Sequence, residues 1–307
     1  MEVNVIRRKR EENRMVTPAS STDRGGCSHP NAADLNHSPQ AQSEAVQPHA
    51  DAQKGPSLPK PLEQETVFSP QKQAEIASDM TKKEVLTKLL NTVDYFETAV
   101  GKFELLRKGK KSLVEYQLSL SEMEGGYSKA TDYDADSKPS RVWLTYYKNG
   151  TLWRTEHGSS ATLDAKKYKF NRSGATLIPE EAFRTDSQGM TVTTYRERPP
   201  IGIAQSSLFP YEIASNFTRD YNDWEIEKQD ERLLDHHTIV LTGKIKNSDK
   251  HGAQTFRFWV DKDSGILAKY ELYDGNSNVV SYLKPVELHV NVPVETKMFE
   301  PPHQNKK

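Results

Sequence analysis

Apolar residues recur at three- and four-residue intervals in one stretch of the chain, which is the spacing of a single face of an α-helix. They are Val85, Leu86, Leu89, Leu90, Val93, Phe96 and Val100. Thr81 followed by Glu84 is a capping-box signature before this stretch, and Gly101 follows it. The pattern therefore predicts an amphipathic helix that ends at Gly101 and packs its apolar face on a flat surface.

Alternating apolar and polar residues dominate the chain after this helix and predict β-strands. LVEYQLSL at 113–120 alternates cleanly, and RVWLTYYKNGTLWRTE reads as a hairpin that turns at Asn149-Gly150. Further strands are expected at 161–170, 190–195, 238–245, 255–260, 267–273 and 279–290. Short sequential strands joined by turn residues favour an antiparallel meander over βαβ units.

A second amphipathic stretch, SSLFPYEIASNF, interrupts the strands. Phe209, Ile213 and Phe217 recur every four residues, and Leu208 joins them. Ser207 is a candidate N-cap and Pro210 fits an early helical position. We expect one lid helix from Leu208 to Phe217. A sheet with one apolar face can bury that face against helices, and if it curves strongly without closing it becomes a half-barrel with an apolar concavity.

Composition divides the chain into a tail and a folded part. Residues 1–73 contain one aromatic residue, Phe68, and are rich in Pro, Ser, Gln, Ala and Asp, so they predict a disordered tether. Residues 74–302 contain all four tryptophans and all thirteen tyrosines, enough for one domain, and 303–307 form a tail. The net charge of −1 gives no general attraction to nucleic acid, and no nucleic-acid partner is expected.

The first residues resemble parts of an export signal. Residues 7–10 are basic and Cys27 follows Gly25-Gly26 as in a lipoprotein cleavage site, but the apolar segment of about seven or more residues that should lie between them is absent. No intact signal peptide is therefore present. Two interpretations remain open: a stray cysteine in a disordered tail, or an altered start upstream of a lipidated Cys27 that attaches the protein to a membrane.

Catalytic and metal-binding patterns are weak. Asp235-His236-His237 is a histidine cluster, but adjacent strand residues point to opposite faces and do not easily reach one ion. Asp132, Asp134 and Asp136 imitate the start of a calcium loop that lacks its later glycine and glutamate. The chain also lacks a phosphate-binding glycine loop and a Gly-x-Ser-x-Gly motif. We expect no enzymatic activity, no metal and no cofactor.

The C-terminal part, from FRFWVDKDSG to MFEPP, resembles the closing hairpins of the LolA-like family of bacterial lipoprotein carriers. The residues at or near the family's positions are Phe258, Trp259, Val260, Asp261, Gly265, Asp274, Gly275, Val279, Val280, Asn291, Phe299 and Pro302. Upstream, Lys148, Arg154 and Glu156 match a family strand, although its usual proline is missing and Gly275 comes early in its turn. The likeness covers about 80–302 and is closer to Gram-positive sporulation and germination lipoproteins and to sensor domains that regulate anti-sigma factors.

The resemblance implies a mainly β (α+β) half-barrel, a curved antiparallel sheet covered by helices, in an extracytoplasmic protein. Its concavity would bind a lipidated or otherwise apolar ligand, as the lipoprotein carriers do. The candidate lining residues are Leu208, Phe209, Ile213, Phe217, Tyr116, Leu144, Tyr146 and Phe258. The alternative is a regulatory or structural domain that docks a partner protein and holds no exchangeable ligand.

Overall fold

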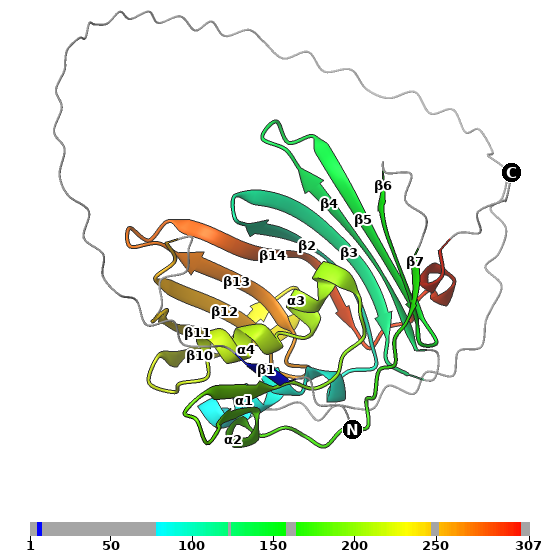
Figure 1. Cartoon of the computed structure of the whole chain (residues 1–307). Helices are drawn as coiled ribbons and strands as arrows, with labels where there is room; N and C mark the ends of the chain where they lie inside the picture. The colour runs from blue at the N-terminus through cyan, green and yellow to red at the C-terminus, as the bar shows by residue number, and fades with distance from the viewer. Residues whose placement is uncertain (1–4, 8–77, 122–123, 158–163, 247–251, 302–307) are drawn as a thin grey trace, which may run out of the picture. The chain divides into compact units, whose positions relative to one another are not determined.

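The structure, a computed structural model, describes residues 5–7, 78–121, 124–157, 164–246 and 252–301 (Figure 1). The helices are α1 (Lys82–Leu90), α2 (Pro179–Ala182), α3 (Gln205–Leu208) and α4 (Tyr211–Phe217), with short 3-10 turns at Thr92–Asp94, Gly202–Ala204 and Thr296–Phe299. The strands are β1 (Val5–Arg7), β2 (Thr98–Arg107), β3 (Lys110–Ser119), β4 (Gly125–Tyr133), β5 (Pro139–Lys148), β6 (Thr151–His157), β7 (Asp164–Lys167), β8 (Phe183–Thr185), β9 (Thr191–Thr194), β10 (Trp224–Leu233), β11 (His236–Lys244), β12 (Thr255–Asp261), β13 (Leu267–Tyr273) and β14 (Val279–Val290).

Eleven of these strands form one antiparallel sheet in the order β10-β11-β12-β13-β14-β2-β3-β4-β5-β6-β7. Every neighbour except β14–β2 is also a neighbour in sequence, so the sheet is a meander in which the C-terminal strand joins the two halves. The sheet bends strongly, and its two end strands do not pair with each other (Figure 1). The predicted fold class, a curved, open antiparallel sheet with helices on one side, is confirmed.

A small second sheet has the order β1-β9-β8. Its strand β1 falls within the segment 1–73 that was expected to be a tether, and it pairs with β9 from Val5↔Thr194 to Arg7↔Val192. The other residues of that segment lie outside the described residues, as does the C-terminal tail at 303–307.

The predicted hairpin at Asn149-Gly150 is confirmed. Both residues have positive φ, 46° and 74°, which is the type I′ geometry that joins twisted antiparallel strands. Strand β5 enters this turn and β6 leaves it, with Lys148 paired to Thr151. Local turn chemistry alone is thus sufficient to fix the register of this pair.

The first helix is shorter than its apolar spacing predicts. The capping box at Thr81 and Glu84 is present, but α1 ends at Leu90 rather than near Gly101. Asn91 follows the helix, and its side-chain amide donates to the carbonyl oxygens of Thr87 (2.7 Å) and Leu177 (2.8 Å). Asparagine competes for backbone groups in this way and terminates helices, so the later apolar residues belong to a 3-10 turn and to β2.

The predicted lid helix is two helices, α3 and α4, separated by Phe209-Pro210. Proline has no backbone N–H, and its ring displaces the preceding residue from helical geometry, so Phe209 is extended with φ −133° and ψ 74°. Ser207 is not a cap: its hydroxyl donates to the carbonyl oxygen of Leu267 on β13 at 2.9 Å and so attaches α3 to the sheet.

The helices and the 3-10 turn at Gly202–Ala204 cover one face of the large sheet, which we call the inner face. Ser128 on β4 donates to the carbonyl oxygen of Ile201 at 2.9 Å, which marks this face on the β4 side. On the other half of the sheet, the ring of Phe217 from α4 packs edge-on against Phe256 and Phe258, at 5.5 Å between centroids in each case. The opposite, outer face carries exposed ion pairs such as Lys102–Glu115.

Candidate functional site

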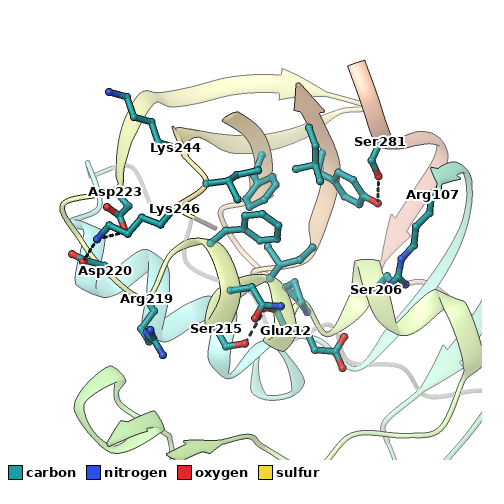
Figure 2. A pocket seen from close by; sticks show the side chains of 18 of the residues that line it. Arg107, Ser206, Glu212, Ser215, Arg219, Asp220, Asp223, Lys244, Lys246 and Ser281 are labelled. Carbon is teal, nitrogen blue, oxygen red and sulfur yellow. Dashed lines mark hydrogen bonds and ion pairs between the residues drawn. The ribbon is translucent and has the colours of Figure 1, made fainter. Parts of the chain in front are cut away.

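A cavity of about 580 Å³ lies between α3 and α4 and the inner face of the sheet (Figure 2). Its apolar lining comes from helix and strand residues alike: Leu105, Phe209, Ile213, Phe217, Ile245, Phe258, Tyr270 and Leu272. The volume falls in the range of roughly 300–1,000 Å³ that is typical of small-molecule sites. This cavity, lined by aromatic and aliphatic side chains with polar groups at both ends, is therefore the candidate functional site.

Strand register brings the wall of this cavity together. Phe258 on β12 is paired with Tyr270 on β13, Tyr270 with Leu283 on β14, and Leu283 with Leu105 on β2. Directly paired residues share a face of an antiparallel sheet, so residues that are distant in sequence form one apolar row. The row ends under α4, where Phe217 contacts Phe258.

The wall and the lid differ in burial. Phe258 is fully buried, stacks on Phe256 at 4.4 Å between centroids and meets Tyr270 edge-on at 6.2 Å. By contrast, Ile213 and Phe217 on α4 are only partly buried although they face the same cavity. The helix side of the cavity thus retains apolar surface that no described residue covers.

One end of the cavity is polar. The hydroxyl of Ser281 donates to the carbonyl oxygen of Leu106 at 2.8 Å, so the hydroxyl of Tyr270, 3.3 Å away, is the donor to Ser281. Burial raises the pKa of Tyr270, with the nearby charge of Arg107 opposing the shift, and the phenol stays neutral at physiological pH. Arg107 and Ser206 lie at this same end (Figure 2).

The other end carries ion pairs. Lys246 lies 2.6 Å from a carboxylate oxygen of Asp220 and 2.8 Å from one of Asp223. Hydrogen bonding to these two carboxylates raises the pKa of Lys246, and the bond from Lys246 lowers the pKa of Asp220. Two further cations, Arg219 and Lys244, lie at this end of the rim (Figure 2).

Four of the eight residues predicted from the sequence meet at the cavity: Phe209, Ile213, Phe217 and Phe258. Phe209 is mostly core, since it is 1% exposed and stacks on Phe96 at 5.9 Å. The sequence pattern did not identify Leu105, Tyr270 and Leu272 as lining residues, although Tyr270 and Leu272 stand on either side of Glu271 in a predicted strand.

The other four predicted residues do not line the cavity. Leu208 is fully buried, and Tyr116, 2% exposed, fills the space opposite Gly101 in the core. Leu144 and Tyr146 lie on the outer face, because the inner-face residue Ser128 is paired with Thr145 and neighbours along a strand alternate. Tyr146 packs there against Tyr127 at 5.3 Å between ring centroids.

The histidine cluster makes structural contacts. His236 faces a carboxylate oxygen of Asp261 at 2.8 Å and the carbonyl oxygen of Leu288 at 3.0 Å, whereas His237 faces Asp230. In the described ranges, no three His, Cys, Asp or Glu side chains are placed to hold a metal ion, and no helix combines the length and apolarity needed to cross a bilayer. Cys27 lies outside the described residues.

No model of a protein family and no curated protein matches the chain. Solved structures that it does match include the MucA/MucB complex of Pseudomonas aeruginosa (13% identity, 72% of this chain and 61% of that chain, TM-score 0.40). The chain also matches LprF from Mycobacterium bovis, with 8% identity over 71% of this chain and 98% of that chain and a TM-score of 0.36. A third match is a LolA superfamily protein from Nitrosomonas europaea, with 11% identity over 72% of this chain and 99% of that chain and a TM-score of 0.22. The matched region spans less than two thirds of the MucB chain.

Proposed function

We propose that the protein is a non-enzymatic, extracytoplasmic binder that holds an acyl chain or another apolar ligand in the cavity under α4. The observation that carries the proposal is the partly covered apolar surface of Ile213 and Phe217 opposite the aromatic wall of Phe258. An apolar group against α4 would remove the exposed apolar surface of Ile213 and Phe217 from water, which stabilises a complex by about 25 cal/mol per Å² of apolar area.

Polar contacts hold the lid helix α4 in place beside the cavity. Arg198 pairs with Glu212 of α4 at 2.9 Å, and the hydroxyls of Tyr195 and Ser215 lie 2.7 Å apart. Glu212 and Ser215 also line the cavity, so these contacts hold α4 at the rim and leave Ile213 only partly covered. This is expected of a site that is largely formed before its ligand arrives.

The direct test is organic-solvent extraction of the purified full chain followed by mass spectrometry, together with titration of the neutral dye Nile red. We expect a co-purified acyl compound or saturable dye binding. Ile213→Trp should fill the cavity and abolish binding, whereas Val279→Trp, at a position 42% exposed and outside the cavity, should leave it unchanged. Absence of both an extract and dye binding in the parent protein would overturn the proposal.

A second candidate function, docking of a partner protein, is favoured by one residue of the inner face. Trp143 on β5 is 38% exposed and lies beside Ala130, away from the cavity residues. A large exposed aromatic ring on the concave side of a sheet is typical of a protein contact. If the extraction and dye titrations are negative and Trp143→Ala weakens a purified partner's binding, docking replaces ligand transport.

We also propose that a lipidated Cys27 attaches the protein to a membrane outside the cytoplasm. Two or more acyl chains on one cysteine give stable anchoring, and the polar segment that follows it would keep the domain away from the head groups. Intact mass of the natively produced protein tests this. A soluble species that starts at Met1 and carries no lipid would rule the anchor out.

A further inference from the structure

The two ends of the cavity differ in the carboxylates that lie beside their cations. At one end, Lys246 is matched by Asp220 and Asp223. The third carboxylate of the lining, Glu212, is matched by Arg198 at 2.9 Å. All carboxylates that line the cavity therefore have a cationic partner.

The opposite end holds two cations that have no carboxylate partner. Arg107 is exposed at the end of β2, Lys108 follows it in the hairpin, and neither makes an ion pair within the described part of the chain. Arg107 is close enough to Tyr270 for its charge to oppose the rise in the pKa of that phenol. This end therefore carries a net positive charge beside the apolar wall.

Hydroxyl groups complete this corner. The side chain of Ser206 on α3 lines it, and Tyr270 presents its oxygen there while its proton is donated to Ser281 (Figure 2). A guanidinium offers several N–H donors in one plane, the arrangement that suits a carboxylate or phosphate. The corner thus combines a free guanidinium with a serine hydroxyl, next to a cavity that is apolar over its remaining length.

We propose, on the basis of the binding function above, that the ligand is an anionic amphiphile whose carboxylate or phosphate group binds at the corner formed by Arg107, Lys108 and Ser206. Its acyl chain lies along the wall of Phe258 toward α4. At the Lys246 end, Arg219 and Lys244 also make no ion pair among the described residues. An anion there would meet the carboxylates of Asp220 and Asp223, so the head group is assigned to the Arg107 corner.

The test uses the full chain and three ligands with the same tail: lauric acid, dodecyl phosphate and dodecanol, each in competition with Nile red. The two anions should bind about threefold to tenfold more tightly than the alcohol, the size expected for a charge-assisted contact at a partly exposed site. Added salt should reduce this preference. Whichever anion binds more tightly identifies the head group as carboxylate or phosphate, and either order supports the proposal.

The matched variants are Arg107→Gln and Arg219→Gln, two exposed cations at opposite ends of the same cavity. Arg107→Gln should remove most of the preference for the anions without changing dodecanol binding, and Arg219→Gln should leave it intact. Equal losses in the two variants, or none in either, would overturn the head-group assignment. Equal affinity of the parent for all three ligands would overturn it while the binding function stands, and no binding of any ligand would defeat the binding function itself.

Discussion

Truncation of one wall residue and one lid residue separates a binding cavity from an ordinary core. Phe258 is fully buried among Phe217, Phe256 and Tyr270, so Phe258→Ala should lower the free energy of unfolding by about 3–5 kcal/mol. Ile213 is only partly buried. Ile→Ala removes three carbons at about 0.8 kcal/mol each when fully buried, so roughly half of that, about 1 kcal/mol, is expected here.

In dye binding, the order of the two effects should be reversed: Ile213→Ala should have the larger effect and Phe258→Ala the smaller one. Ile213→Ala removes ligand-contacting surface from α4, so Nile red affinity should fall several-fold while stability is almost retained. Phe258→Ala should cost stability first and affect the dye less. Urea unfolding, followed by the fluorescence of the four tryptophans, and dye titration at the same temperature measure both quantities.

Equal and large losses of stability in the two variants, with no dye bound by the parent, would refute this reasoning. That result would mean that the inner side of α4 is closed core. The apolar surface of Ile213 would then contribute to folding alone, and the docking function would become the better account of the fold.

Two further predictions concern Gly265, in the turn between β12 and β13, and His236, at the start of β11. Gly265 has φ 74°, and a Cβ there would lie 2.9 Å from the carbonyl oxygen of Lys88 on α1, whereas Gly109 has φ 72° with no atom within 4 Å. Gly109→Ala should cost about 1–2 kcal/mol of backbone strain and Gly265→Ala about 1–3 kcal/mol more, as measured by urea unfolding; equal costs would mean that the contact with α1 is unimportant. For His236, the hydrogen bond to Asp261 raises the pKa above 6.5, so its contribution to stability is complete below pH 6.5 and is lost as the pH rises through the folded-state pKa. The unfolding free energy should show this decline in the parent and not in His236→Gln, and an identical decline in both would exclude His236 as its source.

The sequence by itself determined the local structure where one residue type has a specific backbone role. Asn149-Gly150 takes the two positive φ values of a type I′ turn, and the capping box at Thr81 starts α1 as predicted. The meander of short antiparallel strands followed from alternation and turn spacing, whereas the open, curved sheet was implied by the family resemblance. The turn, the cap and the pairing of consecutive strands depend on neighbours in the chain, so the sequence is sufficient to predict them.

Strands β2, β4, β8 and β10 were not among the predicted strands. For β4 and β10, the residue types reflect tertiary contacts and position in the sheet. Gly125 and Gly126 open β4 because a Cβ would lie 2.4 Å from the ring of Phe299 and 2.6 Å from Ile201. Glycine is a poor strand former, so the pattern looked like a loop. Strand β10 is highly charged because it is the edge of the sheet, where charges prevent pairing with other chains.

The site itself was decided mainly by the tertiary structure. The strand of Leu144 and Tyr146 carries large side chains on both faces, so its residue pattern does not indicate which face is covered by helices. Pairing of Ser128 with Thr145 sends these two residues outward, while β14, inserted beside β2, brings Leu105 to Tyr270 and Phe258. A cavity wall built from strands far apart in sequence depends on this long-range pairing, which no local pattern contains.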